Sequence, residues 1–238
     1  MTQPGGAGRS THAATPAGLR PAQLAWLAAA VFIVSAGYGA LMPLLPGWLR
    51  ALMPDASAAE VARHVGFHGG AYAAGVLVGA PLWGIVSDRV GRGRILVIGL
   101  LGYVVSLLAL LAPAVADVWA IYALRFATGF FVAAVIPVVS ALVAEHTPEH
   151  QRARRFAWLS AVSLLGFLFG PALSAVAGWL NPGAGVELTS AALTTRSVII
   201  LSALLGAVIM LGLAASCQER ARPARPRKRS DFPKAKAA

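Results

Sequence analysis

Asp88 and Arg92 are two of the few charged residues of this chain that could do chemistry, because they stand between two long apolar stretches. Asp88 would end a helix, where the helix dipole disfavours a negative charge. It therefore needs a cationic partner, and Arg92 can supply one. Gly84 would permit a close helix approach, and Gly91, with Gly93, would permit a tight turn. The segment predicts a charged turn between two helices.

Arg125 lies inside another apolar stretch, over residues 118–144. A guanidinium does not lose its charge, and placing it in lipid is costly, so it must face a cavity or a partner. An alternative is that Arg125 lies near enough to the outer end of its helix to extend to the membrane surface. We favour a functional role, because charges inside a membrane span are usually retained for function.

Glu60, His64 and His68 are spaced four residues apart, which places them on one helix face and is compatible with metal binding. The alternatives are a polar helix end on the outer side or a pH-sensitive outer face. We predict no metal site and no cofactor. The single cysteine, Cys217, excludes paired-cysteine sites, and no nucleophile–base pair or phosphate loop is found. The chain is therefore not expected to be an enzyme.

These residues sit in a chain that is 58% hydrophobic and only 12% charged, which is too few charges for a water-exposed surface. Six apolar stretches have about the 20-residue length that spans a bilayer. They run over residues 22–49, 66–87, 95–116, 118–144, 156–180 and 196–216. We expect a disordered cytoplasmic segment at 1–20, a six-helix transmembrane domain at 21–217 and a basic cytoplasmic tail at 218–238.

The basic residues indicate topology rather than nucleic-acid binding, although the net charge is +11. Most of the 20 Lys and Arg residues fall on one side when the N-terminus is placed inside. Cytoplasmic loops retain such residues, so both termini are expected in the cytoplasm, with the protein in the cell (inner) membrane. The predicted partners are the lipid bilayer and a small-molecule substrate, with no nucleic acid.

The segment over residues 84–94 resembles the cytoplasmic signature of the major facilitator superfamily, in which a glycine and an Asp are followed by Gly-Arg and further basic residues. In that family the loop locks the outward-open state, and an acid at the inner end of the fourth helix pairs with its arginine. The resemblance assigns this gating motif to Gly84, Asp88, Arg89, Gly91, Arg92, Arg94 and Glu145. The plain alternative is a basic loop that only fixes topology.

Three further motifs resemble the same family. Arg125 and Gly129 have the spacing of its fourth-helix motif, implicated in proton coupling or substrate handling, and Tyr38 is expected to line the cavity with them. The fifth and first stretches resemble motifs of drug:proton antiporters. Their residues are Gly166, Gly170 and Pro171, and Gly37, Pro43 and Pro46. Ser174 and Ala175 replace a glycine pair of the antiporter motif, and generic helix packing explains these residues equally well.

The resemblance implies an all-α transmembrane fold, a six-helix half-bundle built as two inverted three-helix repeats. It implies export of a small molecule by alternating access, with proton coupling left open because no Asp or Glu lies inside a predicted span. The tail resembles the linker between the family's two halves. A second half or a second copy would complete the path. The alternative is a non-transporting subunit or a truncated remnant. Substrate, direction and coupling ion are not readable from the sequence.

Overall fold

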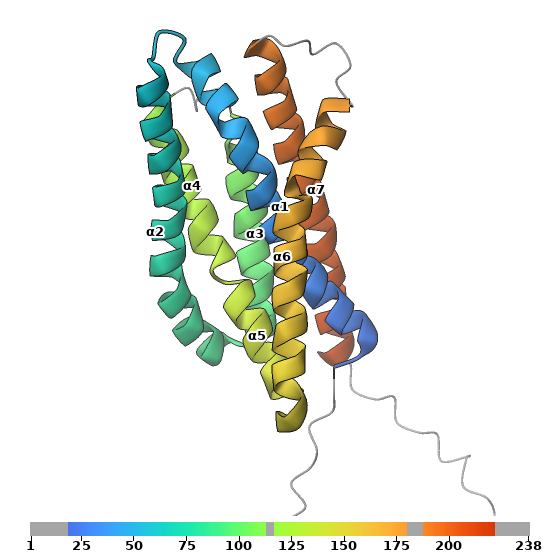
Figure 1. The fold of residues 1–238 in the computed structure, drawn as a ribbon. Coiled ribbons are helices and arrows are strands. Elements are labelled where there is room, and N and C mark those ends of the chain that lie inside the picture. The colour runs from blue at the N-terminus through green and yellow to red at the C-terminus, as the bar shows by residue number, and fades with distance from the viewer. Residues whose placement is uncertain (1–18, 113–116, 180–187, 222–238) are drawn as a thin grey trace, which may run out of the picture.

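The computed structural model describes residues 19–112, 117–179 and 188–221, and these residues are almost entirely α-helical (Figure 1). Most of the predicted disordered segment and of the predicted tail lies outside the described residues. The helices are α1 (Pro21–Leu52), α2 (Ala58–Val90), α3 (Arg92–Ala109), α4 (Val118–Val132), α5 (Ile136–Glu145), α6 (Glu149–Trp179) and α7 (Leu188–Ala221). Within the described chain, six helical segments are long and apolar enough to cross a membrane, and α4 with α5 forms one of them. The all-α prediction is confirmed.

The second helix begins at Ala58, well ahead of the predicted residue 66. Ser57 and Glu60 explain the difference, because they form a capping box. The Ser57 hydroxyl accepts from the Glu60 backbone N–H, and the Glu60 carboxylate accepts from the Ser57 backbone N–H. These bonds satisfy N–H groups that would otherwise be unpaired at the helix start. Glu60 and His64 consequently lie within the helix rather than ahead of it.

Pro137 coincides with a break in the fourth span, which stops at Val132 and resumes at Ile136. The amides of Ala134 and Val135 bond three residues back instead of four, which tightens the chain locally. The carbonyl of Phe130 then receives the indole N–H of Trp83 from α2 at 2.8 Å. A donor from a neighbouring helix thus satisfies a carbonyl that the break leaves free.

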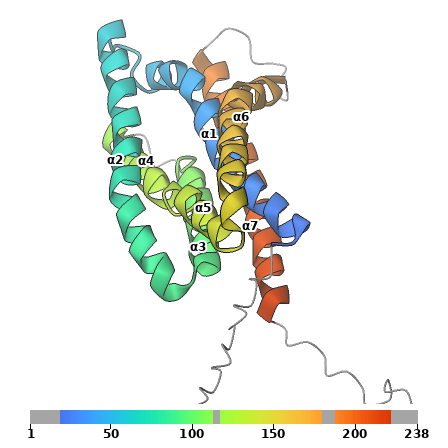
Figure 2. The same cartoon turned by 60° about the horizontal axis from the view of Figure 1, so that its bottom comes forward.

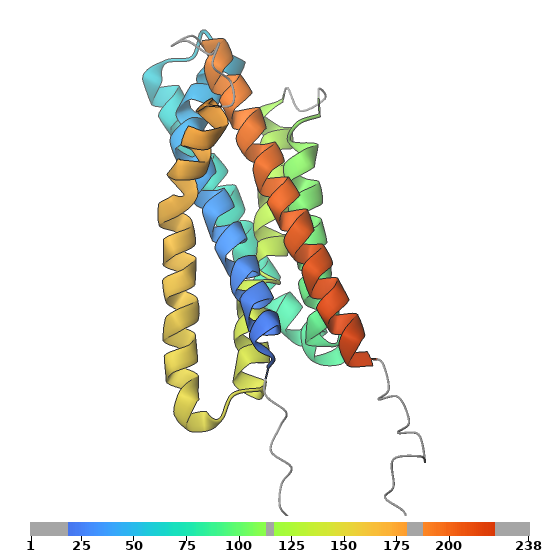
Figure 3. The ribbon, with the colours of Figure 1, turned by 90° about the vertical axis from the view of Figure 1, so that its right-hand side faces the viewer.

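The helices pack as two inverted repeats, α1–α3 and α4–α7. Spans one to three are α1, α2 and α3, and spans four to six are α4 with α5, α6 and α7. Exchanging the first span for the fourth, the second for the fifth and the third for the sixth reproduces the packing. α1 packs against α6 and α7, while α4 packs correspondingly against α2 and α3, and α3 also meets α7. Figures 1 and 3 show α2 with α4 and α1 with α6 as neighbouring helix pairs. The predicted repeat architecture is therefore present.

Glycines bring the backbones together in both pairs. In the α2–α4 pair, a Cβ on Gly75 or Gly129 would overlap the backbone carbonyl of Phe126 or Tyr72. In the α1–α6 pair, a Cβ on Gly39 would overlap the carbonyl of Phe167, and one on Gly166 would overlap that of Phe32. Close packing of helices in lipid depends on such small residues.

The described core gathers around α1, α3 and the fourth span, with a smaller share from α7, whereas α2 and α6 leave much apolar surface open. Leu77 on α2 is 76% exposed, and Leu164 and Leu168 on α6 are each 70% exposed. In a membrane protein such faces contact lipid or another protein. Figure 2 shows α2 and α6 on either side of the bundle, and there the light-blue end of α1, which holds Pro43 and Pro46, turns aside from its axis.

Candidate functional site

The turn between α2 and α3 is made by Gly91, which has a positive φ of 103°. Only glycine adopts this conformation without strain, so the prediction for Gly91 is confirmed. Gly93, by contrast, lies inside the first turn of α3. Because the turn is so short, Asp88 at the end of α2 and Arg92 at the start of α3 lie side by side.

Arg92 joins two acids. Its Nη2 donates to Asp88 Oδ1 at 3.3 Å and lies 3.2 Å from Glu145 Oε1 at the end of α5. Asp88 and Glu145 belong to different three-helix repeats, so one guanidinium links the repeats at this end of the bundle. We call Asp88, Arg92 and Glu145 the inner gate, after the gating role and the cytoplasmic side that the sequence analysis expects for them.

The ion pairs of the inner gate are weak. The side chains of Asp88 and Glu145 are 67% and 50% exposed, and that of Arg92 is 22% exposed. Ion pairs this accessible to water contribute about 1 kcal/mol or less each. These ion pairs therefore fix how the ends of α2, α3 and α5 lie relative to one another more than they stabilise the fold.

Other residues of the predicted gating motif lie differently. A Cβ on Gly84 would meet nothing within 4 Å, so the close helix approach expected there is wrong for the described residues. The Gly84 carbonyl instead accepts from the Ser87 hydroxyl at 2.9 Å. Arg89 and Arg94 are exposed at the ends of α2 and α3.

Arg125 is 1% exposed and does not extend to the membrane surface. Its Nε donates to His68 Nε2 on α2 at 2.8 Å. Its Cζ lies 5.9 Å from the centre of the Tyr72 ring, one turn further along α2, at a distance typical of cation–π contacts. The expectation that Arg125 needs a partner inside the span is met by His68 and Tyr72.

The surroundings of Arg125 contain buried polar atoms that have no partner within the described chain. They are His68 Nδ1, Arg125 Nη2, Tyr103 Oη and Ser202 Oγ. Gly37 faces Tyr103 and Ser202, and a side chain there would overlap the Tyr103 hydroxyl. Gly37 thus makes room for this hydroxyl. The grouping of Gly37 with Pro43 and Pro46 in the sequence did not predict this role.

Tyr38 lines a hollow of about 250 Å³ in the side of the bundle. Its lining comes from α1, α2 and α6: Val34, Ser35, Tyr38, Tyr72, Ser163, Leu164 and Phe167. The ring of Tyr38 lies 4.7 Å from that of Tyr72 and 6.0 Å from that of Phe167, measured between centres. The Ser35 and Ser163 hydroxyls share a hydrogen bond of 2.9 Å. Aromatic faces and hydroxyls together suit an amphipathic molecule.

Glu60, His64 and His68 do not converge. Glu60 caps α2, the His64 ring shares a hydrogen bond with the Tyr122 hydroxyl, and His68 receives Arg125. The described residues contain no group of three or more His, Cys, Asp or Glu side chains arranged for a metal. The three helical neighbours on α2 therefore serve three different structural roles.

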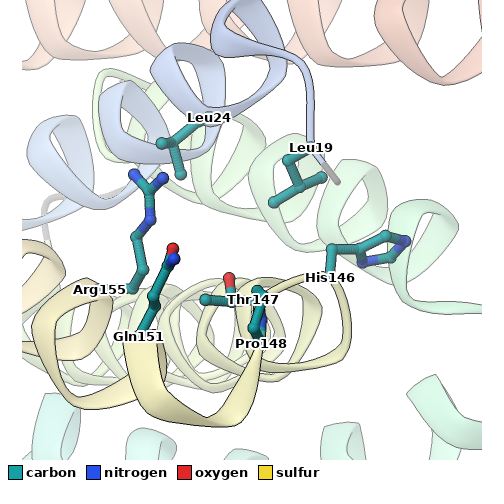
Figure 4. Close-up of a pocket in the computed structure, with 7 residues that line it drawn as sticks. All are labelled: Leu19, Leu24, His146, Thr147, Pro148, Gln151 and Arg155. Atoms are coloured by element: carbon teal, nitrogen blue, oxygen red, sulfur yellow. The ribbon is translucent and has the colours of Figure 1, made fainter. Parts of the chain in front are cut away.

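A second hollow, of about 160 Å³, lies at the end of the bundle that carries the inner gate. Figure 4 shows its lining, with the Arg155 side chain of α6 extending toward Leu24 of α1. The other lining residues are Leu19, His146, Thr147, Pro148 and Gln151. His146 follows Glu145 directly, so this hollow adjoins the inner gate and is separate from the one at Tyr38.

The packing motifs lie in helix interfaces. Gly170 lies against the backbone of Gly39 and Ala40, and Pro171 follows within the unbroken α6. Ser174, which departs from the family's glycine, donates to the Ala40 carbonyl at 2.8 Å. Gly129, expected to act with Arg125, packs against the α2 backbone at Tyr72. Gly129 therefore sets how closely α4, and with it Arg125, approaches α2.

Sequence reasoning missed Tyr72, and it grouped His68 with Glu60 and His64 without connecting it to Arg125. The signal was present, because His68 and Tyr72 continue the four-residue spacing of Glu60 and His64 into the apolar part of the helix. A buried guanidinium needs an acceptor or an aromatic face, and these are the residue types that supply them.

The sequence of this chain is similar to those of known membrane transport and resistance proteins. The model of the Major Facilitator Superfamily matches residues 22–237. The chain is 34% identical over 146 residues to the class B tetracycline resistance protein of Escherichia coli, covering 61% of this chain and 35% of that protein. It is 30% identical over 144 residues to the quinolone resistance protein NorA of Staphylococcus aureus, covering 60% and 35%. The chain thus spans about a third of the length of these curated relatives.

Proposed function

Because the chain belongs to the major facilitator superfamily, we propose that it forms half of a transporter that moves a small molecule across the cell membrane by alternating access. Proteins of this superfamily are generally transporters rather than enzymes. The observation that carries the proposal is the position of Arg92, which holds an acid from each three-helix repeat at one end of the bundle. A transporter needs such a contact to close one side while the other side opens.

The hollow at Tyr38 supports a substrate with a flat apolar part and polar groups. Tyr38, Tyr72 and Phe167 offer ring faces, and Ser35 and Ser163 offer hydroxyls. The names of the relatives connect them with resistance to tetracycline and to quinolones. We propose export of molecules of this amphipathic aromatic class, in the direction that removes them from the cell.

A second six-helix bundle, or a second copy of this chain, is proposed as the partner. The hollow takes its lining from α1, α2 and α6 and is open toward the surface. Leu77 on α2 and Leu164 on α6 are largely exposed beside it. A partner that covers these two helices would enclose the hollow and bury both apolar faces.

The proposed orientation places both termini and the inner gate in the cytoplasm. α1 begins and α7 ends at the end of the bundle that carries Asp88 and Glu145 (Figures 1 and 3). The arginines of the two turns at that end, between α2 and α3 and at the start of α6, agree with the retention of positive charge in the cytoplasm.

Transport by inside-out membrane vesicles tests the proposal, with tetracycline and a quinolone as probes and with the chain alone or with any six-helix partner that co-purifies. We expect saturable accumulation by the wild type. Asp88→Asn, Arg92→Gln and Glu145→Gln should each lower it on the order of tenfold, the size of a typical coupling free energy. The exchange of Arg92→Glu with Glu145→Arg should restore part of the loss.

Arg154→Gln is the matched control, because Arg154 is an exposed arginine at the same end but outside the inner gate. It removes the same charge and should leave transport unchanged. Equal losses in Arg154→Gln and Arg92→Gln would contradict the gate and favour a loop that only fixes topology. Absence of saturable accumulation in every combination would contradict the transport function.

A further inference from the structure

The hydrogen bond between Arg125 and His68 fixes the protonation of the histidine. Arg125 Nε lies 2.8 Å from His68 Nε2, and the two side chains are 1% and 0% exposed. A guanidinium keeps its protons and can only donate, so Nε2 must be the acceptor. An imidazole with an accepting Nε2 is neutral and carries its proton on Nδ1. His68 is therefore held in one neutral tautomer.

We propose that His68 binds a proton in competition with Arg125 and is the residue through which protons act on this half of the transporter. The proposal deepens the transport function above and rests on it. A proton from solvent would form an N–H bond with the Nε2 lone pair that Arg125 now occupies. The hydronium ion that delivers the proton breaks one O–H bond and leaves as water, and no oxidation or reduction takes place. The pair gains one positive charge, and the two cations repel each other.

Another contact is available to the Arg125 guanidinium once it leaves His68. Its Nη2 has no partner within the described chain, and its Cζ is 5.9 Å from the Tyr72 ring. Tyr72 also lines the hollow beside Tyr38. A guanidinium that leaves Nε2 can keep a cation–π contact with Tyr72 while it moves toward the hollow. Protonation of His68 would thereby change the charge presented to a bound substrate.

No carboxylate of the described residues lies beside His68 to take the proton in its place. The neighbouring groups on α2 are His64 and Tyr72, and α4 contributes Arg125 and Tyr122. α1 contributes Tyr38 and α3 contributes Tyr103. Apart from Arg125, the charged residues of the packed elements and their turns lie toward the outer ends (Arg50, Asp55, Glu60, Arg63 and Asp117) or the inner ends (Arg20, Asp88, Arg89, Arg92, Arg94 and Glu145). Tyrosine hydroxyls stay protonated at physiological pH. Of the two described groups that contact Arg125, His68 and Tyr72, His68 is thus the one whose charge can change.

Nitrogen NMR of the complete chain in lipid nanodiscs tests the proposal without any transport. With the imidazole and guanidinium nitrogens labelled, His68 is assigned by the signal that His68→Gln removes. We expect Nδ1 protonated and Nε2 unprotonated at neutral pH, and on acidification the signals of His68 and of Arg125 Nε should shift with one midpoint. A protonated Nε2 at neutral pH, or an Arg125 signal that ignores the titration of His68, would overturn the proposal.

Two variants test whether Arg125 and the proton compete for His68. In Arg125→Gln the competing donor is gone, so His68 should take up its proton at a pH higher by about one unit or more, a tenfold gain in proton affinity. An unchanged midpoint overturns the competition. His64→Gln is the matched control, because His64 is one turn away on the same helix face but bonds Tyr122. It should leave the His68 midpoint where it is. The wild-type measurement stands by itself if Arg125→Gln does not fold.

Transport then separates this proposal from the proposed function. The Gln in His68→Gln can still accept from Arg125 but cannot bind a proton. The variant should keep substrate binding and lose the dependence of transport on the proton gradient, while His64→Gln keeps it. A His68→Gln protein with wild-type proton dependence overturns the role of His68. If the wild type moves no substrate at all, the proposed function fails, and the NMR titration still decides whether His68 and Arg125 compete.

Discussion

The α2–α4 pair and the α1–α6 pair occupy equivalent places in the two repeats and are joined in the same way. Each has glycines whose missing side chains let one helix touch the carbonyls of the other, and each has a hydrogen bond to a main-chain carbonyl, from Trp83 in one pair and Ser174 in the other. The buried polar contacts differ. The α1–α6 pair holds two serines, Ser35 and Ser163, where the α2–α4 pair holds a guanidinium and an imidazole.

The difference separates what holds the bundle together from what the bundle does. Two serines can bond each other without any charge, so the α1–α6 pair is complete as it stands. Within the described residues, Arg125 has one accepting partner and an Nη2 without one, and a buried charge with so little compensation is costly. We infer that the buried charge of the second contact is retained for function, whereas the first contact needs no such explanation, although its hydroxyls also line the hollow.

The largest expected effect is the loss of stability when the glycine packing that both helix pairs share is removed. Gly129→Val and Gly39→Val would each push a side chain into a backbone carbonyl that cannot rotate away. Each should lower the free energy of unfolding by about 3 kcal/mol or more, toward the upper end for overpacked sites. Thermal unfolding in detergent and the yield of monodisperse protein measure this.

Gly84→Val is the control for these two variants, since nothing lies within 4 Å of its added Cβ. It should unfold like the wild type. A large loss in only one of the two helix pairs would contradict their equivalence.

The next largest effect should be confined to the α2–α4 pair. Replacing Arg125 and His68 together by leucine removes a poorly compensated buried charge and should raise the free energy of unfolding by about 1–4 kcal/mol. Transport should be lost. Replacing Ser35 and Ser163 together by alanine removes both ends of a neutral hydrogen bond and should change stability by about 1 kcal/mol or less. Stability and transport of both double variants are to be measured side by side. A destabilised leucine variant would show that the charge contributes to the fold.

The smallest effect should be the same in both pairs. Trp83→Phe removes the donor to the Phe130 carbonyl, and Ser174→Ala removes the donor to the Ala40 carbonyl. Each should lower the free energy of unfolding by about 1 kcal/mol, the usual contribution of one hydrogen bond. Chemical unfolding curves of the two variants should nearly coincide. A much larger loss in Trp83→Phe would mean that the break in the fourth span depends on the indole.

Much of the fold could be predicted because lipid leaves few choices. A chain with long apolar stretches must form helices of spanning length, and the prolines and glycines then mark where they bend and touch. The pairing of Arg92 with Glu145 was also anticipated, since the family resemblance placed both at one end of the bundle. The expected packing at Gly84 was wrong, because a glycine shows where a close approach is allowed and not whether a neighbour arrives.

The sequence by itself determined the membrane-spanning helices, their small-residue faces and the need for a partner at Arg125, because these follow from local residue types and from the low polarity of lipid. It also determined that Asp88, Arg92 and Glu145 stand at helix ends. Only the tertiary structure decided that His68 receives Arg125, that Trp83 bonds the broken fourth span and that Tyr38 meets Tyr72. Those contacts join residues far apart in the chain, and the crossing of the helices, set by many packed side chains at once, brings them together.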